Sequence, residues 1–325
     1  MSFFYALKIV DVLFTPTKYY RTVIFYIWWG DIMKTYKSNE ELIEYLISKN
    51  VKIINKKDTL NKLCKYSYYS IINSYKNIFK NENNEYKDGV TFDEIFSLYE
   101  FDKNLKFIFL KYTLEIEVHI KSLIANQISK EYGIINYLNI NNLDENSEHK
   151  SKIKLINKIT DEIEDDYKVH TAVTHYKDKY GYIPPFVLTK ILTFGVISSY
   201  YGLLKQKDRQ YIAKQFNLSD KILKQILKNL TIVRNISAHS DRLYCFRSKY
   251  YISFKNIEEN YNNKDNFTNL YMIIKCMNCL LDTKEKNKFN KEINRELKKL
   301  SKKLFSIEIN DILNIMGFPK NKTNL

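Results

Sequence analysis

The 325-residue chain carries 45% hydrophobic and 27% charged side chains, with 52 Lys and Arg against 37 Asp and Glu for a formal charge of +15. So much apolar material excludes a disordered chain, and only 7 Gly and 4 Pro exclude the frequent tight turns of a sandwich, a barrel or a doubly wound sheet. We therefore expect an all-α globular protein whose excess positive charge attracts nucleic acid or an anionic membrane.

Residues 1–32 contain two apolar stretches. Charged residues such as Lys8 and Asp11 interrupt them well short of the roughly 20 apolar residues that a membrane span needs, so no transmembrane segment is expected. A membrane-surface segment, an extra helix and an upstream extension of the reading frame remain as interpretations. We favour the last two, because Met33 begins a Lys/Glu-rich run typical of a natural start.

Residues 33–90 are expected to form an N-terminal helical subdomain. Ser38 stands shortly before two glutamates, a pattern typical of a helix N-terminus. Apolar residues at three- to four-residue spacing over 58–80 predict two further short helices. A charged run and Gly89 end the segment.

Residues 91–283 are expected to form the main helical domain. Apolar residues over 101–130 follow one stripe and predict a long central helix, whereas the Asn- and Lys-rich segment 139–168 predicts a peripheral one. A mostly apolar run over 186–204, which contains Gly195 and Gly202, predicts a single helix. The next helix begins after Ser219 and leads into candidate functional residues.

Residues 284–325 are expected to form a basic helical tail packed on the core. Apolar residues at four- and three-residue spacing over 284–303 form a docking seam, which leaves the opposite face cationic. That face is either a solvated surface or an RNA contact. Its candidate RNA-binding residues are Lys291, Arg295, Lys298, Lys299 and Lys302.

Cysteine usage indicates a reducing compartment. Four cysteines are too few for a secreted disulfide scaffold and no cleavable signal peptide opens the chain, so we expect a cytoplasmic protein. Zinc binding by Cys276 and Cys279 is one interpretation, but no matching Cys or His pair accompanies them, and their apolar helical surroundings favour buried packing. We expect no metal and no cofactor.

Arg234, Asn235 and His239 are the candidate catalytic residues. An imidazole exchanges protons with ribose and leaving-group oxygens near neutral pH, and a guanidinium matches the oxygens of a phosphate in transit. Such a pair suits metal-independent RNA cleavage, in which the RNA's own 2′-oxygen attacks and leaves a 2′,3′-cyclic phosphate, so DNA would be inert. The spacing alone, however, favours a structural histidine at a helix end.

Several blocks of the chain, in one order, resemble abortive-infection proteins of the AbiD/AbiF type, which are bacterial antiphage proteins. The segment 234–244, RNISAHSDRLY, is similar to their RN-x-x-AH-x-x-RLY signature. Further similar blocks are YYSIINSYK at 68–76, LYEFD at 98–102, TFGVIS at 193–198 and MGFP at 316–319. The chain departs from the pattern at Ser74, where Gly is usual, and lacks the closing Trp. The resemblance spans about residues 35–320.

This resemblance implies an α-helical HEPN-type domain, whose Arg-x4–6-His motif is a ribonuclease signature. Carried over by position, Arg234 stabilises the phosphate, His239 is the acid/base group, Asn235 orients them and Arg242 is a supporting cation. HEPN nucleases typically join two motifs, and this chain has one, so the resemblance implies a homodimer. It also implies a phage trigger.

His119 is an alternative partner for the motif within one chain. It follows Glu115 by four residues on the predicted long helix, so the two are supporting candidates. The pattern favours a buried histidine that is hydrogen-bonded to that carboxylate.

Two functions from different classes remain open. The first is a ribonuclease that cuts host or phage RNA during infection. The second is a regulatory protein that grips a cognate small noncoding RNA through Lys and Arg and stacks bases on some of its 27 Tyr without cutting. A DNA-binding module is a distant third, because no clear recognition helix is present.

Overall fold

The computed structural model describes residues 36–239, 241–252, 267–319 and 325. The chain forms two units, residues 1–37 and 38–325, and every element below belongs to the second. The expected extension over residues 1–32 lies outside the described residues.

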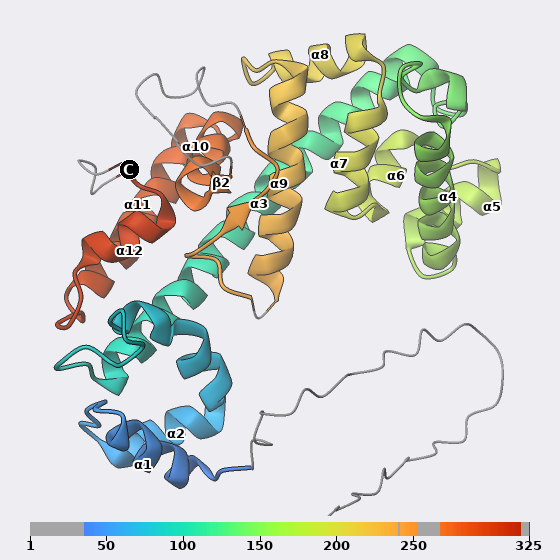
Figure 1. The fold of residues 1–325 in the computed structure, drawn as a ribbon. Helices are drawn as coiled ribbons and strands as arrows, with labels where there is room; N and C mark the ends of the chain where they lie inside the picture. Colours follow the sequence, from blue (N-terminus) through green and yellow to red (C-terminus); the bar gives the residue numbers. More distant parts are fainter. Residues whose placement is uncertain (1–35, 240, 253–266, 320–324) are drawn as a thin grey trace, which may run out of the picture. The chain divides into compact units, whose positions relative to one another are not determined.

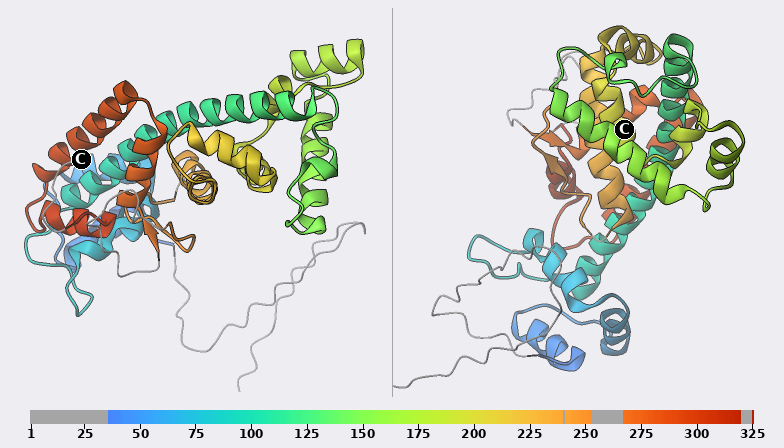
Figure 2. Two further views of the ribbon diagram at one scale, coloured as in Figure 1. Left: turned by 90° about the horizontal axis from the view of Figure 1, so that it is seen from above. Right: turned by 90° about the vertical axis from the view of Figure 1, so that its right-hand side faces the viewer.

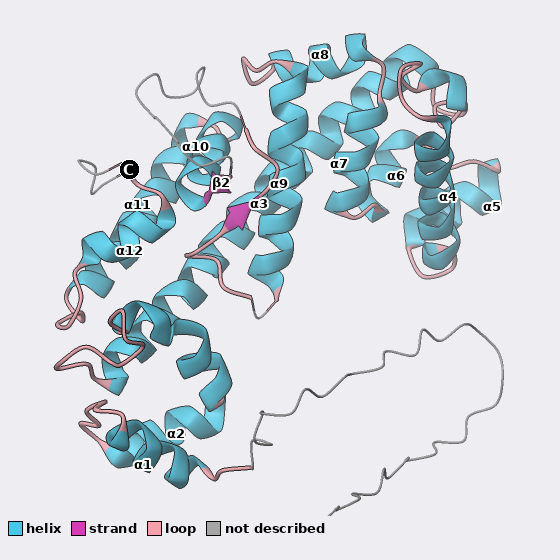
Figure 3. Cartoon of the chain, viewed as in Figure 1, coloured by secondary structure: helices cyan, strands magenta, loops and turns pink. Residues whose placement is uncertain are grey.

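The expectation of an all-α fold is confirmed. Helices make up almost all of the regular structure in the described residues, and their one sheet is a two-stranded ribbon of β1 (Arg247–Ser248) and β2 (Thr268–Asn269) (Figure 3). No helix in the described part of the chain combines the length and the apolar content needed to cross a membrane.

Short helical elements open the second unit: α1 (Asn39–Ser48), α2 (Lys56–Tyr66), the π turn η1 (Tyr69–Asn73) and the 3-10 turn η2 (Lys76–Phe79). Ser38 caps α1 as its sequence predicts, because its hydroxyl accepts from the Glu41 amide and the Glu41 carboxylate accepts from the Ser38 amide at 2.6 Å. Of the two helices predicted over 58–80, only the first is an α-helix. The second is replaced by the two irregular turns.

The central element is α3 (Phe92–Tyr132), a helix of 41 residues. Thr91 caps it through a capping box with Glu94, and Gly133, at φ +77°, ends it. The predicted central helix is therefore confirmed, and it begins at the Thr91–Glu94 cap that the sequence offers, nine residues before the apolar stripe over 101–130. Helices α6, α8, α9, α10 and α11 pack against α3 (Figure 1).

A helical block covers the C-terminal half of α3, comprising η3 (Ile140–Asn142), α4 (His149–Asp166), α5 (Thr171–Tyr180), α6 (Pro185–Ile191), α7 (Phe194–Leu203) and α8 (Gln206–Lys214). The prediction of one helix over 186–204 is wrong. Leu192 and Thr193 are extended, and the Thr193 amide donates to the Glu162 carboxylate of α4 at 3.2 Å instead of to a helical carbonyl. This break lets both α6 and α7 pack on α4.

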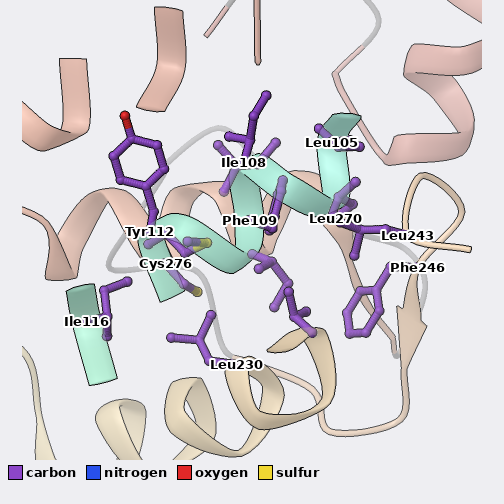
Figure 4. Packing of buried hydrophobic residues seen from close by; sticks show 14 of the residues in the cluster. Leu105, Ile108, Phe109, Tyr112, Ile116, Leu230, Leu243, Phe246, Leu270 and Cys276 are labelled. Atoms are coloured by element: carbon purple, nitrogen blue, oxygen red, sulfur yellow. The ribbon is translucent and has the colours of Figure 1, made fainter. Parts of the chain in front are cut away.

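The C-terminal part of the unit comprises α9 (Asp220–Ala238), α10 (Leu270–Leu280), α11 (Thr283–Ser301) and α12 (Ile309–Met316). Figure 4 shows buried side chains of α3, α9 and α10 in one core, among them Phe109, Leu230 and Leu270. Cys276 is fully buried in this core, which confirms its interpretation as a small packing residue, and burial raises the pKa of its thiol well above the usual value.

Candidate active site at the C-terminal end of α9

Helix α9 is amphipathic, and this property decides which motif residues reach solvent. Ser219 caps its first turn by accepting from the Ile222 amide, as predicted. The buried face, including Leu227 and Leu230, packs on α3 and α7, so Asn235 on the opposite face is exposed.

His239 is the C-cap residue of α9. Its backbone leaves the helix at φ −119° and ψ −173°, and its side chain is exposed. The Lys106 ammonium on α3 donates to the His239 carbonyl at 3.3 Å, which ties this end of α9 to α3 and adds a cation beside the motif. The imidazole itself makes no hydrogen bond or ion pair with another described residue, so both ring nitrogens remain available.

Arg234 lies half-buried one turn before His239. Its Nε is buried and has no hydrogen-bond partner among the described residues, and no carboxylate described in the structure pairs with its guanidinium. An unsatisfied buried donor costs about 1–3 kcal/mol. Together with its fork of N–H donors, this makes Arg234 suited to an acceptor such as a phosphate oxygen.

Asp102 of α3 fixes the chain just after the motif. This carboxylate is fully buried and accepts hydrogen bonds from the Leu243 amide at 3.1 Å, the Tyr244 amide at 2.6 Å and the Tyr75 hydroxyl at 2.7 Å. Burial raises the pKa of the Asp102 carboxyl, and these three hydrogen bonds oppose the shift. The segment after His239 is thereby held against both α3 and the turn before η2.

Arg242 contributes to the same anchoring. Its Nη1 donates to the Ser74 carbonyl at 2.6 Å, while its side chain stays exposed. Tyr75 and Tyr244 stack with ring centroids 5.8 Å apart. Three blocks that resemble the abortive-infection pattern, at 68–76, 98–102 and 242–244, are therefore neighbours in space.

The expectation for His119 is wrong. His119 and Glu115 are both exposed, no hydrogen bond joins them, and the His119 ring lies edge-on against Phe216 with centroids 5.1 Å apart. Phe216 precedes the N-terminus of α9, whereas His239 follows its C-terminus. Along α3, His119 lies 13 residues beyond Lys106, or about 20 Å, so one chain does not bring His119 to His239.

The five candidate RNA-binding cations, four on α11 and Lys302 at its C-cap, are exposed, and the apolar seam of this helix is buried, as expected. Lys291, Arg295 and Lys298 line a hollow of about 590 Å³ beside α12, whereas Lys299 and Lys302 line another of about 380 Å³ beside α3. Figures 1 and 2 show α9 and α11 on different sides of α3. The cationic face is therefore not continuous with the end of α9 in one chain.

Sequence reasoning missed Lys106 and the anchoring role of Asp102. Two features of the sequence could have indicated them. Asp102 stands in a block that resembles the family pattern, and Lys106 follows Asp102 by one helical turn on the same face.

The fold and the site define an all-α protein that presents an Arg-Asn-x3-His segment at an exposed helix end. The family model for Abi-like proteins matches residues 61–245, more than half of the chain, from α2 through the motif. The chain belongs to this Abi-like family. This membership indicates a role in abortive infection, the defence of bacteria against phage.

One curated protein is similar over a limited stretch. The "Repetitive organellar protein" of Plasmodium falciparum (isolate 3D7) is 28% identical over 219 residues, which cover 62% of this chain and 11% of that protein. The chain thus spans about a tenth of the length of this relative. No solved structure matches the chain.

Proposed function

We propose that this Abi-like protein is a metal-independent endoribonuclease of the HEPN type that acts in phage defence. The observation that carries the proposal is the end of α9, where an exposed imidazole lies one turn beyond an arginine whose buried Nε has no described acceptor. An imidazole and an unpaired guanidinium at one solvent-accessible helix end supply one acid/base group and the phosphate-stabilising cation that ribose-assisted cleavage uses.

The chemistry assigns a role to each motif residue. His239 takes the proton from a ribose 2′-hydroxyl, the 2′-oxygen bonds to phosphorus, and the bond to the 5′-oxygen breaks as that oxygen receives a proton. The products are a 2′,3′-cyclic phosphate and a 5′-hydroxyl. Arg234 stabilises charge on the phosphoryl oxygens, and Asn235, four residues before His239 on the same face, orients these two catalytic groups.

A homodimer would supply the second acid/base group. One imidazole accepts a proton and another group must deliver one to the leaving oxygen, while His119 lies at the other end of α9. A second copy of His239 is the group best suited to that step, because a two-fold interface repeats the same residues on both sides.

The test is expression in a bacterial host, with and without phage, followed by sequencing of RNA ends. Wild type should create new ends bearing 2′,3′-cyclic phosphates and should protect the culture, whereas His239→Ala should do neither. His149→Ala, which removes an exposed histidine at the start of α4, is the matched control. Equal protection by wild type and His239→Ala without new RNA ends would refute the nuclease.

A second candidate function is RNA binding without cleavage. The exposed cations of α11 favour it, because they are oriented to solvent while the apolar seam holds the helix on the core. In that case RNA would co-purify with the protein, and protection would survive His239→Ala but fall when the cations of α11 are replaced by Gln.

A further inference from the structure

A basic hollow of about 580 Å³ lies between α4, α7 and α9, away from the motif. The residues that define it, here called the lysine hollow, are Lys154 and Lys158 of α4, Ser198 and Ser199 of α7, and Lys224 and Lys228 of α9. No Asp or Glu is among the described residues that line it. Four lysine side chains therefore line one concave surface whose described residues include no carboxylate.

The four lysines are not neutralised elsewhere. None of them forms an ion pair with a described carboxylate, and within each pair the four-residue spacing places two like charges side by side on a helix, which is unfavourable. Lys224 donates to the Gly202 carbonyl at 3.0 Å, and the Lys228 ammonium lies 3.6 Å from the centre of the Tyr250 ring. These contacts orient the ammonium groups without forming an ion pair, and the carboxylates that act on Lys224, Asp144 and Asp220, lie outside the lining of the hollow.

The environment of Lys224 shows that grouping these lysines is electrostatically unfavourable. Burial, and then the nearby charge of Arg209, lower the pKa of the Lys224 ammonium. Gly202 makes the close approach possible, because a Cβ there would lie 3.1 Å from Lys224 Cε. An anion in the hollow would relieve the repulsion among these ammonium groups.

The lysine hollow and the motif share one face of α9. Lys224, Lys228, Asn235 and His239 are separated by four, seven and four residues, so on an ideal helix they lie within about 60° of one another. All four are exposed. Lys228 and Asn235 are about 10 Å apart along the helix axis, so a strand whose scissile phosphate lies at the motif would pass directly along this face toward the hollow.

We infer that the lysine hollow binds phosphate groups of the same single-stranded RNA that the motif cleaves. This inference rests on the proposed function. Ammonium groups track phosphates without reading sequence. The apolar floor, formed by Leu155, Val196 and Leu203, suits the face of a base or sugar, and the volume is that of a nucleotide-sized site.

The test measures RNA binding in the His239→Ala background, so that cleavage does not interfere. A labelled single-stranded RNA is titrated with the protein at several salt concentrations. We expect Lys224→Gln/Lys228→Gln to weaken binding about tenfold and to reduce the slope of log affinity against log salt by roughly 1.4, which is two phosphate contacts on a single strand. Lys154→Gln/Lys158→Gln, on the opposite wall, should act alike and provides an independent test if the first variant does not fold.

The matched control is Lys52→Gln/Lys57→Gln, which removes two exposed lysines near α2 and should leave both affinity and slope within twofold of the parent. Hollow variants that bind like this control would overturn the inference. Competition separates the two sources of phosphate. If AMP binds the parent as tightly as the RNA and loses binding in the hollow variants, the ligand is a free nucleotide and the RNA assignment is overturned.

Failure of the nuclease proposal gives a different pattern. In that case wild type makes no cuts, yet the hollow variants still lose RNA affinity relative to the control. If instead wild type cuts RNA and the hollow variants bind RNA normally, the nuclease stands and the hollow does not contact RNA.

Discussion

The amide of Tyr244 donates a 2.6 Å hydrogen bond to the carboxylate of Asp102, and this bond joins the chain beyond α9 to the N-terminal third of α3. The motif residue His239 lies five positions upstream, between the helix that positions Arg234 and the segment that Asp102 holds. Both ends of the motif are therefore fixed to α3, directly or through α9, before any substrate binds. Such fixed placement is what a guanidinium and an imidazole need to act on one phosphate.

Replacing Asp102 should destabilise the protein strongly. Asp102→Ala leaves two backbone amides and the Tyr75 hydroxyl without acceptors in a buried site, so we expect a loss of about 3 kcal/mol in the free energy of unfolding. Asp102→Asn retains one acceptor oxygen and should lose less. Urea unfolding measures both. Glu115→Ala, at an exposed position without a described partner, should stay within about 0.5 kcal/mol of wild type, and an equally small effect for Asp102→Ala would contradict the anchoring role.

The α3–α11 contact should weaken in acid. Burial opposes ionisation of Glu292, but hydrogen bonds from Lys111 at 2.8 Å and Tyr112 at 2.9 Å outweigh it and lower the pKa of this carboxyl. The Glu292 carboxylate therefore contributes its full stabilisation above pH 4.5, the ordinary pKa of a glutamate. That contribution is lost as the pH falls through the lower pKa of the folded state. We expect Glu292→Gln to be less stable than wild type at pH 7 and the difference to close below pH 4.5, measured by urea unfolding across pH. A stability difference between wild type and Glu292→Gln that grows in acid would contradict the lowered pKa of Glu292.

Gly317→Ala should be costly at the end of α12. Gly317 has φ +91°, and a Cβ there would lie 2.2 Å from the Asn269 side chain, so strain and a clash add. Gly89→Ala is the matched control, because Gly89 has φ +82° but open space around it, and we expect it to cost only about 1 kcal/mol. Thermal melts should show Gly317→Ala clearly below Gly89→Ala. Equal melting temperatures would mean that the Asn269 side chain moves away from the new Cβ without an energetic cost.

Arg234→Lys should abolish most RNA cleavage while leaving the fold intact. A lysine keeps the charge but lacks the planar fork of donors, and loss of such transition-state contacts costs about 100-fold or more in rate. The measurement is the yield of new RNA ends per amount of folded protein. Undiminished cleavage by Arg234→Lys would show that Arg234 acts through charge alone or not at all.

Mixed dimers test whether two motifs form one site. With a fivefold excess of His239→Ala chains, random pairing leaves about one sixth of the wild-type chains paired with each other. RNA cleavage should then fall to about that fraction. The same excess of His149→Ala chains should raise cleavage instead, because that variant retains the motif. An unchanged yield with His239→Ala would indicate that each chain cuts alone.

Local patterns predicted much of the helical framework. The long apolar stripe of α3, the caps at Ser38 and Ser219 and the docking seam of α11 depend on residues near one another in the chain, so spacing suffices to find them. The break at Thr193 was missed because the carboxylate that accepts from its amide, Glu162, lies thirty-one residues away on α4. The apolar run over 186–204 carries no mark of that contact.

The candidate site was likewise predictable only where its features depend on residues close in the sequence. Periodicity along α9 correctly places Asn235 on the exposed face. Burial of Asp102, and the proximity of Lys106 to His239, arise only when α3 and α9 pack side by side. His119 was expected inside because Glu115 stands at helical spacing, but that spacing fixes which residues share a face and not which face is covered.

Incubation of purified wild type and His239→Ala with total bacterial RNA in the presence of EDTA tests the central claim most directly. The account predicts discrete cuts by wild type alone, with 2′,3′-cyclic phosphate and 5′-hydroxyl ends, and no cutting of DNA. Identical ends from both proteins, or cutting that appears only when divalent metal is restored, would contradict it.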